Sequence, residues 1–267
     1  MHFILITSVR IALTGVLLAI IPGAGNAACN LVAGYTAEPP YHYPDNDGKI
    51  IGIDADILRG VLNDIGCSIT FEILPWKRTL SQIKGGRTDT TMGASFKNER
   101  AKFAYYSIPY RGQPHVIVIK KSANVVAGSL KEFLENGHSL GVVLGWHYTN
   151  DIRALLDAPE YRSQIFVAPK FELLLKMDAA RRFSGFLTNP SVLAGFIGGE
   201  RLKAEYNMVR ADVDILHFLF SKKSVSAETA HKYNSRLKER LDTGFFFEIC
   251  KKYESQLVSG CTYLSTK

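Results

Sequence analysis

Short strand-like and helix-like segments alternate along almost the whole chain, and this alternation restricts the fold more than any other feature. Apolar runs such as CNLVAGY (29–35) and SITFEIL (68–74) are typical of buried strands. The segment between them carries five apolar residues at helical spacing: Ile57, Leu58, Val61, Leu62 and Ile65. Strands that alternate with helices favour parallel sheets covered on both faces, so we expect an α/β protein.

The same pattern continues to the end of the chain. A polar loop is expected after residue 95, and the capping box Ser129–Glu132 predicts the start of a helix. Further strands are expected at 88–95, 115–121, 140–145, 165–168, 185–188, 206–210 and 216–223. Further helices are expected at 76–84, 151–158, 171–182, 190–199, 226–241 and 244–253.

Residues 1–27 have the layout of a secretory signal peptide. Arg10 is the only charged residue among the first 37, and an apolar run at 11–21 follows it. That run is too short to cross a hydrocarbon core of about 30 Å, which disfavours a membrane anchor. Small residues up to Ala27 suit cleavage there. A lipid anchor at Cys29 fits less well, because Asn26 stands where a branched apolar residue is needed. We therefore expect a periplasmic protein.

Four cysteines remain after the leader, and they allow three pairings. Cys29 and Cys67 each begin a strand of one β-α-β unit. The starts of adjacent parallel strands lie about 5 Å apart, which suits a disulfide. Cys250 and Cys261 are close enough in sequence to close a second, short loop. No Cys or His spacing suits zinc, so no metal site is expected.

Charge and motifs exclude several classes of protein. The formal net charge of +7 comes from 32 basic and 25 acidic residues. The basic residues are spread over many expected helices, so nucleic-acid binding is not expected. The sequence contains no P-loop, G-x-G-x-x-G, H-E-x-x-H or G-x-S-x-G motif. We therefore expect an exported protein with a cleft, no catalytic residues and no cofactor.

Three stretches carry a resemblance to a known family: GKIIGIDADILRGVLNDIG (48–66), PWKRTLSQIKGGRTDTTMGASFKNERAKFAYYSIPY (75–110) and LHFLFSKK (216–223) with the closing helices. The chain resembles the family-3 extracellular solute-binding proteins, the polar amino-acid receptors of ABC transporters. The resemblance implies a type II periplasmic-binding-protein fold, with two α/β lobes, a ligand cleft and two crossing strands. It puts residues 28–112 and 216–267 in the first lobe, and residues 118–210 in the second.

The resemblance also implies ligand-binding residues in the first lobe. Arg100 occupies the family's carboxylate-binding position, and a guanidinium can hold a carboxylate through two hydrogen bonds. The backbone amide of Gly93 and the hydroxyl of Ser95 complete that anion pocket. Trp76 matches an aromatic residue that stacks on the ligand, and Tyr41 matches an aromatic residue of the cleft wall.

Other positions concern the ligand's amine and the second lobe. Glu38 lies near the family's first-lobe ligand positions and is a candidate partner for an amine. Trp146 and His147 follow a strand where the family has ligand-facing residues. Asn189 departs from the family, which places an acidic residue there to hold the ligand's ammonium group. Lys97 is a second departure, since the family usually has threonine.

The resemblance implies a monomeric periplasmic receptor that captures a small polar carboxylate-bearing solute and passes it to an inner-membrane ABC permease. An enzyme resembling cyclohexadienyl (arogenate) dehydratase is an alternative, with Glu38 as the acid that protonates a leaving hydroxyl. A subunit that docks on a membrane sensor kinase is another. The sequence does not choose between transport and sensing, and it does not identify the ligand.

Overall fold

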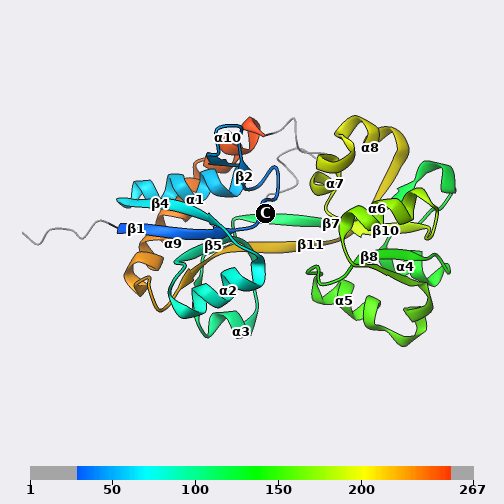
Figure 1. Cartoon of the computed structure of the whole chain (residues 1–267), viewed down its shortest axis with the longest axis horizontal. Coiled ribbons are helices and arrows are strands. Elements are labelled where there is room, and N and C mark those ends of the chain that lie inside the picture. The colour runs from blue at the N-terminus through cyan, green and yellow to red at the C-terminus, as the bar shows by residue number, and fades with distance from the viewer. Residues whose placement is uncertain (1–28, 254–267) are drawn as a thin grey trace, which may run out of the picture.

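Two long antiparallel strands, β7 (Arg111–Lys120) and β11 (Tyr206–Ser221), run through the middle of the molecule and join its two halves (Figure 1). The computed structural model describes residues 29–253. We call the half that contains the N-terminal strand the first lobe and the other half the second lobe. The lobe limits given above stay a prediction.

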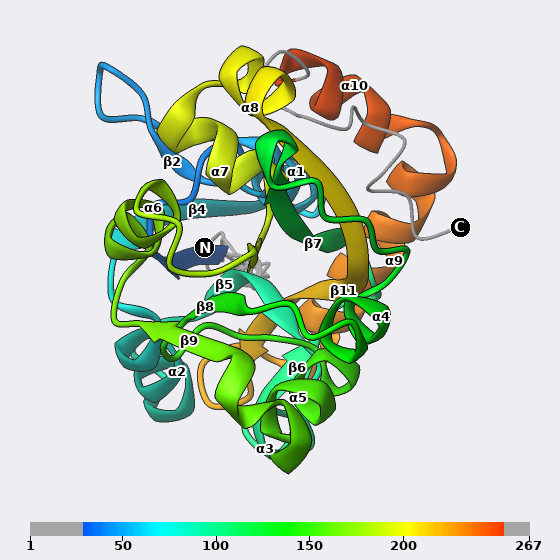
Figure 2. The same cartoon turned by 90° about the vertical axis from the view of Figure 1, so that its right-hand side faces the viewer.

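The first lobe has α1 and α10 on one face of its strands and α2 and α3 on the other, an arrangement visible in both views (Figures 1 and 2). The strands are β1 (Cys29–Tyr35), β2 (Tyr43–Pro44), β3 (Ile50–Ile51), β4 (Cys67–Ile73), β5 (Thr90–Ser95) and β6 (Ala104–Tyr106). The helices are α1 (Ile53–Asp64), α2 (Trp76–Gly85), α3 (Asn98–Ala101), α9 (Ala227–Asp242) and α10 (Phe245–Lys252).

In the second lobe, helices likewise lie on both faces of the strands, with α4 and α5 on one face and α6 and α7 on the other (Figure 2). The strands are β8 (Leu140–Val143), β9 (Ile165–Ala168) and β10 (Gly185–Thr188). The helices are α4 (Leu130–Glu135), α5 (Asn150–Asp157), α6 (Phe171–Ala179), α7 (Pro190–Ile197) and α8 (Gly199–Glu205), with 3₁₀ turns at Lys121–Ala123 and Pro159–Gln164.

One mixed sheet passes through both lobes in the order β4-β1-β5-β11-β7-β10-β8-β9, and β6 also pairs with β11. The outer strands of each lobe are parallel: β1 pairs with β4 and β5, and β8 pairs with β9 and β10. The crossing strands are antiparallel to their neighbours. The expectation of parallel sheets is therefore correct for the outer strands and wrong for the centre, where the chain passes between the lobes.

Strand β11 corrects a second expectation. Residues 206–210 and 216–223 were expected to form separate strands, but β11 is continuous over sixteen residues. The segment between them pairs with β7, which satisfies its backbone groups. The expected polar loop after β5 also contains a helix, the short α3. The remaining predicted strands and helices are present, with ends shifted by a few residues.

The pairing of β11 is irregular at two places. Its register against β7 shifts between Arg210 and Asp212, and its register against β5 shifts between His217 and Leu219. Such bulges bend a strand and change the direction of its side chains. The segment 212–217 therefore lies between an irregularity in the pairing with β7 and an irregularity in the pairing with β5.

Each lobe has its own hydrophobic core. In the first lobe the predicted apolar face of α1 is buried, and Ile65 packs at the edge of that core. The crossing strands contribute to both lobes: Phe218 belongs to the core of the first, whereas Val118 belongs to a core of the second. Burying one such side chain stabilises a fold by roughly 1.5–3 kcal/mol. Among residues 29–253, no helix is both long and apolar enough to cross a membrane.

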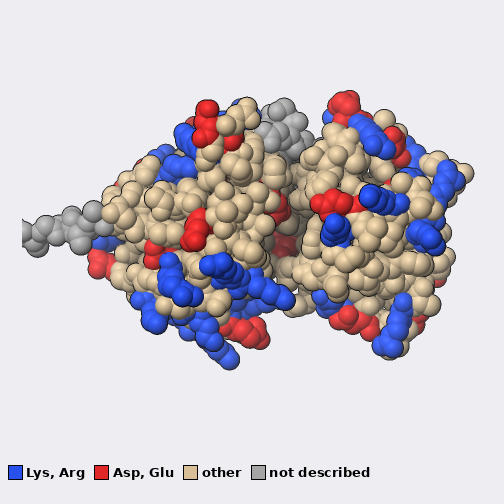
Figure 3. All heavy atoms as spheres, viewed as in Figure 1, with Lys and Arg blue, Asp and Glu red and all other residues tan. Residues whose placement is uncertain are grey.

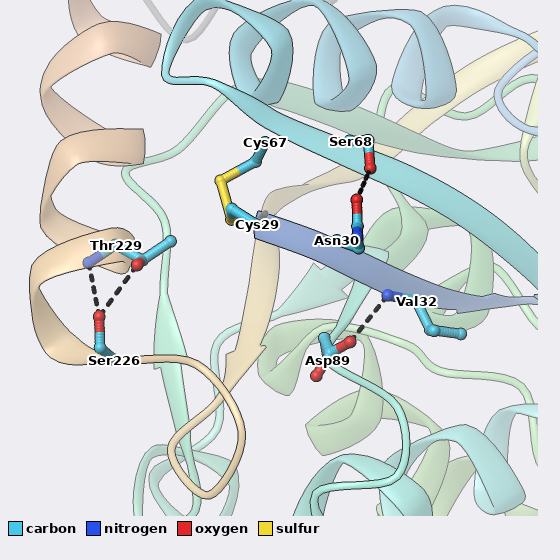
Figure 4. The surroundings of a disulfide bond; sticks show 8 residues. All are labelled: Cys29, Asn30, Val32, Cys67, Ser68, Asp89, Ser226 and Thr229. Carbon is cyan, nitrogen blue, oxygen red and sulfur yellow. Dashed lines mark hydrogen bonds between the residues drawn. A yellow bond between two sulfur atoms is a disulfide. The ribbon is translucent and has the colours of Figure 1, made fainter. Parts of the chain in front are cut away.

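The predicted disulfide between Cys29 and Cys67 is present at the start of the paired strands β1 and β4 (Figure 4). The two residues are direct neighbours in the parallel register, with 4.5 Å between their Cα atoms. Cys250 is buried in α10, and its predicted partner Cys261 lies outside the described residues. The disulfide therefore cross-links the first lobe at the amino ends of its strands.

Replacing both Cys29 and Cys67 by serine is expected to destabilise the protein by about 4 kcal/mol, because the disulfide closes a 38-residue separation and restricts the unfolded chain. Urea unfolding of the variant and the wild type measures this. Ser68→Ala is the matched control, since Ser68 is exposed and its hydroxyl bonds to Asn30 on the same strand pair (Figure 4). Equal midpoints for the cysteine variant and the wild type would contradict the expectation.

Candidate functional site

A cavity of about 680 Å³ lies between the lobes, against the crossing strand β11. The space-filling view shows a hollow between the two lobes with acidic side chains inside it (Figure 3). Three segments line the cavity: the end of β5 with the start of α3, the turn before α5 with the start of α5, and part of β11. The lining residues are Ser95, Phe96, Lys97, Asn98, Glu99, His147, Thr149, Asn150, Asp151, Asp212, Val213, Asp214, Ile215 and His217.

Asp214 contacts side chains of both lobes. Its Oδ2 accepts a hydrogen bond of 2.5 Å from the hydroxyl of Ser95 in the first lobe. The same oxygen lies 3.3 Å from Nε2 of His147 in the second lobe. Burial opposes ionisation of Asp214, but the contacts with His147 and Ser95 outweigh it and hold the pKa of this carboxyl below its usual value. Two predicted site residues, from different lobes, thus share one carboxylate.

Asp212 and His115 lie beside Asp214 on the crossing strands. Asp212 accepts a hydrogen bond from the hydroxyl of Thr149, which also caps α5. His115 is opposite Asp212 in the β7–β11 ladder, so their side chains lie on the same face of the sheet. Asp214 follows Asp212 by two residues in β11, so its side chain lies on that face as well. His115 is 5% exposed, and its Nε2 has no hydrogen-bond partner among residues 29–253. Burial lowers the pKa of His115, which favours the neutral ring.

Arg100 borders this cavity without lining it. Its Nη1 donates a hydrogen bond of 2.9 Å to the carbonyl oxygen of Ser95. Its guanidinium carbon lies 5.3 Å from the ring centroid of Trp76, at the first turn of α2. None of the ion pairs within residues 29–253 involves Arg100. The structure therefore brings Arg100, Ser95 and Trp76 together and leaves the guanidinium without a carboxylate partner in the described chain.

A fully buried ion pair lies deeper in the first lobe. Arg111, the first residue of β7, donates two hydrogen bonds to the carboxylate of Asp54 in α1, of 2.6 and 2.9 Å, and neither side chain is exposed. The Arg111 guanidinium also lies 3.8 Å from the ring centroid of Tyr41. Burial alone would raise the pKa of Asp54, but the charge of Arg111 and contacts with Arg111 and His42 outweigh it and lower that pKa to about 2.

Tyr41 reaches the second lobe at α7. Asn189 caps that helix, because its Oδ1 accepts hydrogen bonds from the backbone of Ser191 and Val192. Burial raises the pKa of Tyr41, and Arg111 together with the nearby side chains of Ser191 and Asn189 offsets this only in part. The Tyr41 hydroxyl and Nδ2 of Asn189 are both buried without a hydrogen-bond partner among the described residues.

The other predicted residues occupy varied positions. The amide of Gly93 donates to the hydroxyl of Tyr110, and the hydroxyl of Ser95 donates to Asp214, so in this structure both groups are already engaged. Glu38 is partly exposed, in a backbone turn that leads into Tyr41. Trp146 stacks on a phenylalanine of α6 and is partly buried in the second lobe.

Sequence reasoning missed Asp212, Asp214 and His115. The signal that could have found them is the short run DVDI between the two expected strands of 206–223. Acidic residues two positions apart in a strand point to the same side, which is unusual for a strand that crosses the centre of a protein. His115 gives no local signal, because only the β7–β11 register brings it to Asp212.

Two α/β lobes, two crossing strands and a cavity between the lobes define the fold of a type II periplasmic binding protein. The family model of the bacterial extracellular solute-binding proteins, family 3, matches residues 31–256, and the chain belongs to that family. No group of three or more His, Cys, Asp or Glu side chains in residues 29–253 is arranged to hold a metal ion.

Relatives and solved structures agree with this assignment. The probable amino-acid-binding protein YxeM of Bacillus subtilis (strain 168) is 23% identical over 246 residues, which cover 89% of this chain and 91% of that protein. An ancestral arginine-binding protein bound to arginine is 22% identical, with a TM-score of 0.65 over 84% of this chain and 97% of that one. A histidine kinase sensor domain is 20% identical, with a TM-score of 0.65 over 85% and 96%. At these identities the solved structures support the fold alone.

Asp54→Asn is expected to destabilise the protein by about 3 kcal/mol or more at neutral pH, because it leaves the charge of Arg111 buried without a partner. Urea unfolding at pH 7 measures the loss. Asp64→Asn is the matched control: Asp64 also binds two arginines and has a pKa lowered to about 2, but it lies at the surface. A smaller loss of unfolding free energy is expected for Asp64→Asn. Equal losses for the two variants would show that burial does not set the size of the effect.

The stability that the Arg111–Asp54 pair contributes is expected to depend on pH in the acid range. The folded-state pKa of Asp54 is about 2, below the unfolded value of 3.8, so its contribution is present above about pH 4 and is lost as the pH falls towards 2. Unfolding free energies measured between pH 5 and 2 should fall less steeply for Asp54→Asn than for the wild type. Parallel curves would show that Asp54 has no lowered pKa in the folded protein.

Proposed function

We propose that this protein captures a small, polar, carboxylate-bearing solute with amino-acid-like chemistry and delivers it to an inner-membrane ABC permease. It acts in the periplasm as a monomer once residues 1–27 have been removed. The lobes close on the solute by bending at the crossing strands. Membership of the extracellular solute-binding family supports the binding role, and the amino-acid-binding relative supports the ligand class.

The state of Arg100 is the observation that carries this proposal. A guanidinium has five N–H donors and binds a carboxylate best through two parallel hydrogen bonds. The carbonyl of Ser95 accepts from one nitrogen of Arg100, and the guanidinium carbon lies 5.3 Å from the ring centroid of Trp76. Ser95, to which Arg100 is bonded, lines the cavity, and no ion pair within residues 29–253 involves the guanidinium, so a ligand carboxylate is the partner that fits it.

One carboxylate of the cavity, and one buried carboxylate deeper in the first lobe, support binding rather than catalysis. A dehydratase that protonates a leaving hydroxyl needs an acid whose pKa is raised towards neutrality. The pKa values of Asp54 and Asp214 are instead lowered by their cationic and hydrogen-bonding neighbours. Both remain ionised at neutral pH, which suits holding a charge and not donating a proton. We propose that the protein is not an enzyme.

Arg100→Gln is expected to weaken binding by about 2 kcal/mol or more, because a desolvated ligand carboxylate loses its charged partner. A thermal-shift screen of the wild type with the twenty amino acids and with small carboxylates identifies a ligand, since ligand at 100 times its Kd stabilises by about 2.7 kcal/mol. Isothermal titration then compares the variant with the wild type.

Arg59→Gln is the control. Arg59 lies in the same lobe and also lies over an aromatic ring, 5.2 Å from the centroid of Phe71, but it is already paired with Asp56. Its replacement should leave affinity unchanged. If Arg100→Gln binds the ligand as tightly as the wild type does, the carboxylate site is not at Arg100.

A further inference from the structure

The crossing strands present an acidic surface to the cavity of a protein that is basic as a whole. The formal charge of the chain is +7. The cavity lining contains one lysine, two histidines and four carboxylates: Glu99, Asp151, Asp212 and Asp214. The field inside the cavity therefore favours a cation, although the molecule as a whole repels one.

Asp214 has an oxygen available for such a cation. Its Oδ2 is shared by Ser95 and His147, whereas its Oδ1 has no hydrogen bond to any of the residues 29–253. The side chain is 14% exposed, so its charge is only partly screened by water. Beside it, Nε2 of the nearly buried His115 also lacks a partner within the described chain. A carboxylate oxygen is an acceptor, as is the unprotonated nitrogen of a neutral imidazole, and an ammonium group supplies the matching donors.

Asn189 is unsuited to the same task. Its Oδ1 is occupied as the cap of α7, so the atom that remains free is the donor Nδ2. A donor repels an ammonium group and fits an acceptor instead. A ligand that carries an ammonium group therefore needs a partner for it elsewhere in the cleft.

Ser95 connects Asp214 to Arg100. The carbonyl oxygen of Ser95 accepts from Arg100, and its hydroxyl donates to Asp214. A positive group and a negative group are thus both bonded to Ser95, and no ion pair between them is found within residues 29–253. A zwitterion, which carries a carboxylate and an ammonium group on one carbon atom, offers one partner to each of these two groups.

We propose that Asp214, flanked by Asp212 and His115 on the crossing strands, binds the ammonium group of the ligand. The inference rests on the proposed function and narrows it, since the ligand must then carry a free amine as well as a carboxylate. The exposed apolar side chains of Phe96 and Ile215 line the same cavity and contact the rest of the ligand.

The test compares matched probes on the wild-type protein. The amino acid that gives the largest thermal shift is titrated beside its N-acetyl derivative, which lacks the ammonium group, and its amide, which lacks the carboxylate. The N-acetyl derivative is expected to bind more weakly by a factor on the order of 30. This comparison needs no variant, so it does not depend on how a substitution affects folding.

Asp214→Asn provides the second arm. The variant keeps an acceptor for Ser95 and loses the charge, and its affinity for the amino acid is expected to fall on the order of 30-fold while its affinity for the N-acetyl derivative changes little. Glu228→Gln is the control, because it removes one negative charge from an exposed ion pair on α9, away from the cavity. Its affinities should equal those of the wild type.

The outcomes separate the two proposals. Amino-acid binding that is equally strong for the N-acetyl derivative, or unchanged in Asp214→Asn, overturns the role of Asp214 and leaves the proposed function standing. Binding of the amide as tightly as the amino acid, with loss in Asp214→Asn, supports Asp214 and overturns the carboxylate site. Failure of every amino acid, amine and small carboxylate to bind overturns both, whereas binding of a small carboxylate alone overturns only the role of Asp214.

Discussion

The buried pair of Arg111 and Asp54 is the interaction on which the arrangement of the first lobe depends. Arg111 begins the first crossing strand and Asp54 lies in the first turn of α1, so their two hydrogen bonds fix where the crossing starts. Neither charged side chain is accessible to water, so each buried charge is stabilised by its partner in the pair. The ring of Tyr41 lies over the guanidinium, which fixes the loop before α1 at the edge of the cleft.

Gly52 lies where the backbone of that loop packs directly against the residues that lead into α1. Its φ angle of 121° lies in a region that other residues rarely adopt, and a Cβ atom there would come within 2.3 Å of the carbonyl oxygen of Tyr41. The loop and the start of α1 are therefore in direct backbone contact. Through Tyr41 the same unit reaches Asn189 and the second lobe, so a charge pair inside one lobe positions a contact between lobes.

Much of the fold follows from local patterns. The spacing of apolar residues in α1, the serine cap of α4 and the alternation of strands with helices are each encoded within a few adjacent residues, and all are present in the structure. The pairing of Cys29 with Cys67 also follows, because the starts of two adjacent parallel strands in one β-α-β unit lie close together. The site could be predicted only in part. Arg100 and Trp76 are near each other in sequence and in space, whereas Asp214 joins residues from far apart in the chain.

The position of Asp214 on a crossing strand has a consequence for the order of events in binding. Between the two register shifts β11 pairs regularly with β7, so Asp214 belongs to the strand pair that the two lobes share. When two bodies rotate about a shared strand, points on that strand move least. A charge carried there has nearly the same position in an open and a closed molecule, while the walls of the two lobes change theirs. Charge would then be recognised at first encounter and shape only on closure, so a cation of the wrong shape could enter and leave without closing the lobes.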